Sequence, residues 1–258
     1  MTVKKIVFYL VCVFFTLSGS FSVEDLMKCS LKDHECQRNL YQTMVREIGK
    51  SGMPDLGIPK MDPIELKNVS VSVLDLVNLT MVDGVAKGIK NCIVDSFMID
   101  IEQKKGSQEI TCDIIIKGQY SLSANSAFVK QVFGGESLHG EGKGKAQLEK
   151  LHISLTFPFY PEKHEDGEIY MTTSNKDIAY KYDVKGKASF AANNIFLGEQ
   201  NISEMVIKYL NENGNLLLRT SGKAFIDKAV ELYFDFAQNF FNKVPAKHFV
   251  LEDLTPYL

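Results

Sequence analysis

A serine, five histidines and a run of glycines are the residues of this sequence best suited to catalysis or phosphate binding. Ser137 lies in the stretch 135–140 (GESLHG), which resembles the nucleophile elbow of a hydrolase but is one residue too long and follows no parallel-strand pattern. The histidines are too scattered to indicate a general base, because they stand at positions 34, 139, 152, 164 and 248. The least favoured functional hypothesis is therefore an esterase that uses Ser137 with His139, His152 or His164.

The glycine run HGEGKGKA places glycine at every second position, at Gly140, Gly142 and Gly144. This spacing differs from dinucleotide-binding and phosphate-loop patterns, and no helical pattern follows it. Alternate glycines on a strand leave one face bare, which permits sharp bending or the close approach of another segment. We interpret the run as a structural feature of a strand.

An acidic cluster is the other candidate for chemistry, because Glu165, Asp166 and Glu168 stand beside His164. The spacing is not that of a calcium loop, and solvated charge in a hairpin turn explains it. The chain also contains no C-x-x-C or H-x-x-x-H pair of the kind that binds zinc. We therefore expect no metal, no cofactor and no catalytic residue, and we predict that the protein is not an enzyme.

The first 20 residues predict a cleaved secretory signal peptide. Lys4 and Lys5 precede an apolar run over residues 6–17, and small residues at 18–20 offer a cleavage site, with Ser22 as a near alternative. The apolar run is too short to span a membrane. The expected product is a soluble secreted protein, without stable membrane insertion, whose single domain covers residues 23–258.

Cleavage removes Cys12 and leaves four cysteines, an even number that predicts two disulfides in an oxidising compartment. Cys29 and Cys36 form the most local pair, and closing that loop would contribute roughly 2–3 kcal/mol. Cys92 would then pair with Cys112.

Composition and charge are those of an ordinary globular protein, with 45% hydrophobic and 24% charged residues. Cleavage would remove two lysines and no acidic residue, so the 29 basic side chains fall to 27 against 32 acidic ones, a net charge of −5. A mildly acidic chain has no electrostatic reason to bind nucleic acid or anionic lipid.

Hydrophobic periodicity predicts an α+β protein with helices at both ends and strands between them. Residues 35–49 carry an apolar stripe at helical spacing, and glycines followed by Pro54 end it. From Ile64 to about residue 192 the period is two, with hairpins expected around Gly106 and at Asp166-Gly167. Consecutive strands with helices at the ends favour an antiparallel sheet over a parallel, Rossmann-like one.

Residues 201–244 form the longest segment with helical periodicity, and large apolar side chains lie on most of its faces. Such a helix must be enclosed, so we expect a long helix held inside a curved sheet. Gly214 and Gly222 each cost a helix roughly 1 kcal/mol relative to alanine. They therefore allow a break that divides the helix into residues 203–213 and 223–242.

The chain resembles the insect takeout and juvenile hormone binding protein family over essentially its whole mature length. At the N-terminal end, Cys29, Cys36, a helix and then SGMPDLGIPKMDPIEL are similar to the family's pattern. The stretch NNIFLGEQNISEMVIKYLNENGNLLLR resembles the family's second characteristic segment, with a leucine-asparagine-glutamate-asparagine motif at residues 210–213. KGQYSLSA and the glycine run fall between the two in the expected order. Gly214 replaces the tryptophan that usually follows the motif.

This resemblance implies a TULIP-like lipid-binding fold, in which a strongly curved antiparallel sheet wraps the long helix and encloses an apolar tunnel. It also implies a non-catalytic extracellular carrier of a small hydrophobic ligand, such as a juvenile hormone, another terpenoid or a fatty-acid-like lipid. The alternative is an extracellular interaction or signalling protein whose tunnel is filled by its own phenylalanines. A continuous cavity on the order of several hundred cubic ångströms would favour the carrier.

Apolar positions of the expected strands and helix, together with a tyrosine hydroxyl as polar contact, are the candidate ligand-binding residues: Phe97, Ile99, Ile114, Ile116, Tyr120, Val206, Tyr209, Leu210, Leu217, Phe225, Ile226 and Val230. We expect a monomer in haemolymph or another extracellular fluid, with an unidentified receptor as a further candidate partner. Three sequons predict N-glycosylation, at Asn68, Asn78 and Asn201. Asn201 also fits the N-cap of the long helix.

Overall fold

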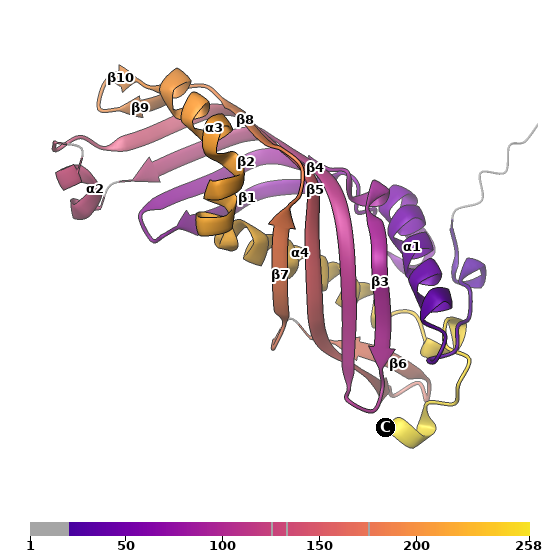
Figure 1. The fold of residues 1–258 in the computed structure, drawn as a ribbon. Coiled ribbons are helices and arrows are strands. Elements are labelled where there is room, and N and C mark those ends of the chain that lie inside the picture. Colours follow the sequence, from indigo (N-terminus) through magenta and orange to yellow (C-terminus); the bar gives the residue numbers. More distant parts are fainter. Residues whose placement is uncertain (1–20, 125, 133, 175) are drawn as a thin grey trace, which may run out of the picture.

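The computed structural model describes residues 21–124, 126–132, 134–174 and 176–258, and the predicted signal peptide lies outside these residues. Its strands form a curved antiparallel sheet, with helices before and after it in the chain (Figure 1). The strands are β1 (Ile64–Val73), β2 (Val77–Lys87), β3 (Ile93–Asp100), β4 (Lys105–Ala124), β5 (Leu138–Lys163), β6 (Ile169–Thr173), β7 (Ala179–Val184), β8 (Ala188–Ala192), β9 (Ile195–Leu197) and β10 (Gln200–Asn201). The helices are α1 (His34–Ser51), α2 (Ala127–Val132), α3 (Ser203–Ser221) and α4 (Lys223–Phe241). The predicted α+β class is confirmed.

One long hairpin organises the sheet. β4 pairs with β5 along its whole length, from Lys105 opposite Pro158 to Ala124 opposite Leu138. Beside β4 lie β3, along its first half, and β2, along its second half, with β1 outside β2. Beside β5 lie β9, β8, β7 and β6, in that order along the strand. β1 and β10 stand at opposite ends of the strand order, so the sheet is open rather than a closed barrel.

The glycine run lies in β5 and makes room for the segment that joins β8 to β9. A Cβ atom at Gly140 would lie 2.6 Å from the carbonyl oxygen of Asn194. At Gly142 it would lie 2.5 Å from Asn193 Oδ1. No side chain fits at these distances, which confirms the structural interpretation of the run.

Glutamine side chains of α1 complete the hydrogen bonding of β3. Gln42 Oε1 accepts from the backbone N–H of Val94 at 2.8 Å, and its Nε2 donates to the carbonyl oxygen of Cys92 at 3.0 Å. Gln37 Oε1 accepts from the N–H of Ile99 at 3.1 Å. Unpaired backbone groups at a sheet edge invite pairing with another chain. α1 therefore protects this edge while its apolar stripe covers the interior.

Two helices occupy the C-terminal segment, and the chain changes direction between them (Figure 1). The break falls at Gly222, where a Cβ atom would lie 2.3 Å from the carbonyl oxygen of Leu218. That oxygen also accepts a hydrogen bond from the Tyr182 hydroxyl at 2.7 Å. The sequence predicts that the first helix could end at residue 213. This bound was wrong, because α3 continues through Gly214 to Ser221.

Two asparagines hold α3 against the edge of β8. Asn211 accepts from the N–H of Phe190 at 2.7 Å and donates to its carbonyl oxygen at 2.9 Å. Asn215 accepts from the N–H of Ala188 at 3.0 Å. A Cβ atom at Gly214 would lie 3.0 Å from the Ala188 carbonyl oxygen, so glycine allows the helix its close approach. The asparagine motif thus includes one of the side chains that seat α3 on the sheet.

The start of α3 also differs from the sequence-based expectation. Ile202, rather than Asn201, is the N-cap residue. Asn201 Oδ1 instead accepts from the backbone N–H of Ser203 at 3.0 Å and from its hydroxyl at 2.7 Å. Asparagine side chains commonly accept hydrogen bonds from the chain two residues ahead.

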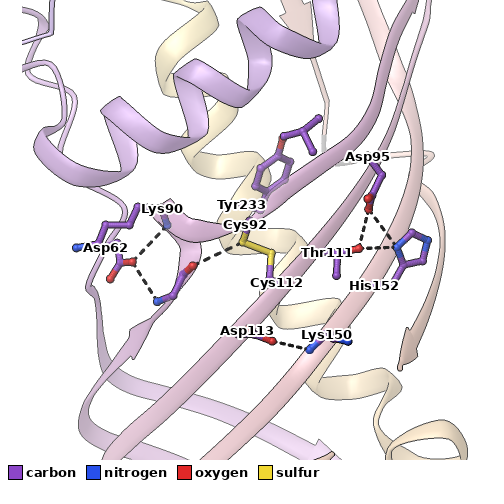
Figure 2. The surroundings of a disulfide bond; sticks show 12 residues. Asp62, Lys90, Cys92, Asp95, Thr111, Cys112, Asp113, Lys150, His152 and Tyr233 are labelled. Atoms are coloured by element: carbon purple, nitrogen blue, oxygen red, sulfur yellow. Dashed lines mark hydrogen bonds and ion pairs between the residues drawn. A yellow bond between two sulfur atoms is a disulfide. The ribbon is translucent and has the colours of Figure 1, made fainter. Parts of the chain in front are cut away.

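Both predicted disulfides are present. Cys29–Cys36 joins the N-terminal segment to α1, and the N–H of Cys29 donates to the carbonyl oxygen of Phe249 at 3.0 Å. The N-terminal and C-terminal segments therefore meet at this disulfide. Cys92–Cys112 joins the residue before β3 to the neighbouring position of β4 (Figure 2).

Candidate ligand-binding site

Buried apolar side chains form two separate clusters. The first, which we call the main cluster, joins α1, α4, β3 and the adjoining parts of β4 and β5. The second, which we call the α3 cluster, has Tyr120 of β4, Ile195 of β9 and Ile202 as its buried members. The two clusters give two places in which an apolar ligand could be held.

The main cluster encloses a cavity of about 20 Å³ against α1. The cavity is lined by Cys29, Leu31, Gln37, Leu40, Tyr41, Met44, Phe97, Ile99, Phe159, Phe241, Phe249 and Val250. That volume holds about one water molecule, whereas ligand pockets are on the order of 300–1,000 Å³. At this end of the molecule, side chains fill the space in which the family resemblance implies a tunnel.

Phenylalanines provide much of this filling. The ring of Phe159 packs edge to face on Phe241, with centroids 4.9 Å apart, and Phe157 packs in the same way on Phe234 at 5.1 Å. Such aromatic pairs contribute about 0.5–1.5 kcal/mol beyond the burial of their surface. The phenylalanines of α4 thus fill the interior together with those of β5, as the alternative hypothesis expects for this region.

A chain of three polar side chains crosses the main cluster. The Tyr233 hydroxyl of α4 donates to Oε1 of Gln108 in β4 at 2.8 Å, and it shares a hydrogen bond with the hydroxyl of Tyr41 in α1. Gln108 is only 1% exposed, so it depends on a protein partner. Burial raises the pKa of Tyr41, which keeps its hydroxyl neutral. The chain therefore fixes α1, β4 and α4 to one another without a buried charge.

The α3 cluster is packed less completely. Its three buried residues are surrounded by apolar side chains that stay partly exposed: Leu79, Leu122, Leu138, Ala192, Leu197, Val206 and Ile207. Tyr120 donates its hydroxyl proton to the carbonyl oxygen of Asn193 at 2.7 Å, and burial raises the pKa of Tyr120. The neutral hydroxyl oxygen retains the capacity to accept a further hydrogen bond.

α3 is apolar over more of its circumference than the sheet covers. Met205, Tyr209 and Leu216 are 62%, 57% and 61% exposed. The helical period of 3.6 residues places Val206, Leu210 and Leu217 between this exposed face and the face on β8, and all three are half-buried. Partly exposed apolar surface therefore continues from the α3 cluster along the helix.

A shallow depression of about 330 Å³ lies where α3 meets the turn between β7 and β8. It is lined by Gly186, Lys187, Ala188, Asn211, Glu212, Asn213, Gly214, Asn215 and Leu216. Most of these side chains are polar, and Asn211 and Asn215 are already bonded to β8. The depression is therefore poorly suited to an apolar ligand.

The structure divides the candidate ligand-binding residues between the two clusters. Phe97 and Ile99 line the small cavity, Ile226 and Val230 are buried in the main cluster, and Ile114 packs at its margin. Tyr120 and Val206 belong to the α3 cluster, whereas Ile116, Leu210, Leu217 and Phe225 are half-buried and Tyr209 is exposed. The candidates therefore do not line one enclosed space.

Several residues of the α3 cluster were not among the candidates predicted from the sequence. They lie in β2, β5 and β9 and at the end of β4: Leu79, Leu122, Leu138, Ile195 and Leu197. The alternation of Asn78, Leu79 and Thr80 was a signal of a half-buried strand. Leu122 likewise continues the even-numbered alternation that Ile114, Ile116 and Tyr120 begin.

The three histidines considered for hydrolysis have other partners. His139 Nε2 lies 3.0 Å from the carbonyl oxygen of Gly198, and that ring stacks on Phe196. His152 Nδ1 lies 3.0 Å from the Thr111 hydroxyl, which donates to Asp95 at 2.6 Å (Figure 2). His164 stacks on Tyr170. These contacts place each ring in a structural arrangement across neighbouring strands or turns.

Within the residues that the structure describes, no three histidine, cysteine, aspartate or glutamate side chains are grouped so as to hold a metal ion. None of the described helices is long and apolar enough to cross a membrane.

A curved antiparallel sheet thus carries two C-terminal helices over an apolar interior. The chain belongs to the haemolymph juvenile hormone binding protein family, whose pattern matches residues 8–251. The crystal structure of takeout 1 from Epiphyas postvittana is similar, with 25% sequence identity and a TM-score of 0.74. The match covers 87% of this chain and 99% of that one. None of the curated proteins matches the sequence.

Proposed function

We propose that this protein is a secreted, non-enzymatic carrier of one small hydrophobic molecule, held between α3 and the strands of the α3 cluster. The supporting observation is the incomplete burial of the apolar side chains that surround Tyr120, Ile195 and Ile202. Each 100 Å² of such surface removed from water would contribute about 2.5 kcal/mol. The ligand class is a juvenile hormone, another terpenoid or a fatty-acid-like lipid, in keeping with the family to which the chain belongs.

The expected affinity follows from ligand size. A molecule of about 20 heavy atoms at roughly 0.4 kcal/mol per atom would bind with about 8 kcal/mol, a dissociation constant near 1 µM. The Tyr120 hydroxyl, which already donates to Asn193, is the candidate polar contact for a ligand that can donate a hydrogen bond. One such bond would tighten binding by about tenfold.

Two substitutions on neighbouring residues of α3 test this location. Val206→Phe adds bulk inside the α3 cluster, so we expect it to weaken the binding of a fluorescent fatty acid by about fivefold to a hundredfold, as overpacking costs about 1–3 kcal/mol. Met205→Phe adds a ring at a position that is 62% exposed, so it should leave binding unchanged. Equal affinity in both variants and the parent would contradict the proposed location.

A second candidate function is favoured by the packing of the main cluster. If phenylalanines fill the whole interior as they fill the region around the 20 Å³ cavity, the protein is an extracellular interaction or signalling protein. That hypothesis predicts no saturable binding of fluorescent fatty acids or juvenile hormone analogues by the folded protein. Saturable one-to-one binding would exclude it.

A further inference from the structure

Two of the three sequons lie on the β1–β2 hairpin, at the outer end of the sheet. Asn68 belongs to β1 and Asn78 to β2, and both are exposed. Within the described part of the chain, neither carboxamide has a hydrogen-bond partner. Both side chains are therefore free to carry a large substituent without any loss of internal contacts.

The pairing of the hairpin places the sequon at Asn78 on its polar face. Ser72 stands opposite Asn78 and Ser70 opposite Thr80, and the hydroxyls of Ser70 and Thr80 hydrogen-bond at 2.8 Å. Successive residues of a strand point to opposite faces. The polar residues therefore share one face, and the half-buried apolar side chains of both strands point to the other.

Asn68 leaves the strand ladder at a local irregularity. It has a φ of +52°, and the register passes from the Lys67–Asp83 pair to the Val69–Met81 pair without a partner for it. Asparagine is among the few non-glycine residues that enter this left-handed region readily. The conformation explains how an exposed asparagine is accommodated between the inward-facing Leu66 and Val69.

Asn201 differs because its sequon builds local structure. Its carboxamide oxygen accepts two bonds from Ser203, and the Ser203 hydroxyl in turn accepts from the N–H of Ile195 at 2.9 Å. The carboxamide oxygen of Asn201 and the hydroxyl of Ser203 are thus both engaged at the start of α3. At the other two sequons only the hydroxyls of Ser70 and Thr80 are bonded, to each other, and among the described residues the asparagine side chains are not engaged.

We propose that Asn68 and Asn78 carry N-linked glycans, that Asn201 does not, and that the two glycans shield the outer strand pair of the sheet. β1 stands at the end of the strand order and has a strand on one side only. The neighbouring turn exposes Leu74 to 67%. An edge strand beside an exposed leucine is a site at which chains associate, and a bulky, hydrated glycan blocks such contact. The inference rests on the proposed secretion.

Site occupancy is measured on full-length protein collected from the medium of a mammalian secretory host. Treatment with peptide N-glycosidase in ¹⁸O-water converts each glycosylated asparagine to labelled aspartate, which peptide mass spectrometry locates. We expect label at Asn68 and Asn78 and none at Asn201. Ser70→Ala and Thr80→Ala should each remove one glycan, whereas Ser70→Thr and Thr80→Ser keep the sequons and should retain both.

The shielding effect is measured on the same secreted protein after enzymatic removal of the glycans. We expect deglycosylated protein to scatter more light on storage at high concentration than a mock-treated sample, while its circular dichroism is unchanged. Secreted protein without label at Asn68 or Asn78, or with label at Asn201, would overturn the assignment. Equal light scattering would overturn the shielding role. Retention of the protein inside the cell would instead contradict the secretion on which the proposed function depends.

Discussion

At the scale of single residues, the buried hydroxyl of Tyr233 makes the clearest energetic contribution. It bonds to both Gln108 and Tyr41, and Gln108 is almost fully buried. Tyr233→Phe would leave the Gln108 oxygen without this donor, at a cost of about 1–3 kcal/mol in the free energy of unfolding. Urea denaturation measures this change. Tyr209→Phe on exposed α3 is the matched control, with an expected change below about 0.5 kcal/mol. Equal effects of the two substitutions would refute the role of the polar chain.

Glu252 gives the fold a dependence on pH. Its carboxylate accepts from the Ser30 hydroxyl at 2.5 Å and from the N–H of Leu31 at 3.0 Å, so it joins the two ends of the described chain. Partial burial raises the pKa of Glu252, but these hydrogen bonds outweigh it and hold the pKa below the ordinary value of 4.5. A depressed carboxyl pKa stabilises the fold above the unfolded-state value, and this contribution is lost as the pH falls through the folded-state value.

Glu252→Gln should therefore lower the melting temperature at pH 7 and reduce its dependence on pH between about pH 5 and pH 3. Thermal unfolding followed by circular dichroism at each pH makes the comparison. Other carboxylates with lowered pKa values, such as Asp227, remain in both proteins, so the difference between the two curves is the informative quantity. Parallel curves would show that Glu252 contributes nothing to the pH dependence.

At the scale of elements, Gly222 decides how α3 passes into α4. A Cβ atom there would lie 2.3 Å from the Leu218 carbonyl oxygen. This oxygen belongs to the backbone, so it cannot move away by a change of side-chain rotamer. Gly222→Ala should destabilise the protein by about 1–3 kcal/mol through this overlap, although alanine favours helix elsewhere. Chemical denaturation is the measurement, with Ser221→Ala as the neighbouring control. A stabilised Gly222→Ala variant would mean that the two helices can merge without strain.

The elements with strong periodicity could be predicted from the sequence. The apolar stripe over residues 35–49 became α1 (His34–Ser51), and the expected hairpin joins β3 to β4, although its turn lies at residues 101–104 rather than around Gly106. β2 was missed, although Val77 and Leu79 alternate with polar residues, because its later half is broken by Asp83 and Gly84. The small helix α2 was also missed, since a six-residue segment is too short to show a period.

The division of the interior into two clusters could not be predicted. Periodicity identifies which face of a helix is apolar, but not how far the facing strands extend. The reach of β4 to Ala124 and of β5 from Leu138 places Tyr120 and Leu122 opposite α3 rather than in the main cluster. Candidates such as Phe97 and Val206 therefore lie in different clusters although both are apolar and expected to face inward. Long-range pairing of the strands, which local sequence patterns do not encode, determines how far β4 and β5 extend and therefore which cluster each side chain joins.

At the scale of the whole molecule, the two ends of the interior differ in how completely they are packed. The main cluster is fixed by aromatic packing, a buried polar chain and two disulfides. The α3 cluster leaves apolar side chains partly exposed on strands that are well paired. A rigid base and an incompletely packed end suit a carrier, because ligand exchange then requires movement of α3 while the main cluster stays intact.

Native mass spectrometry of the protein purified from the medium of secreting cells tests whether the protein carries a ligand. We predict a population heavier than the polypeptide with its covalent modifications by the mass of one small lipophilic molecule. Organic extraction should release that molecule, and Val206→Phe should deplete the heavier population while Met205→Phe does not. Secreted protein that shows only its covalent mass, yields no lipid on extraction and fails to bind fluorescent fatty acids would contradict the carrier function.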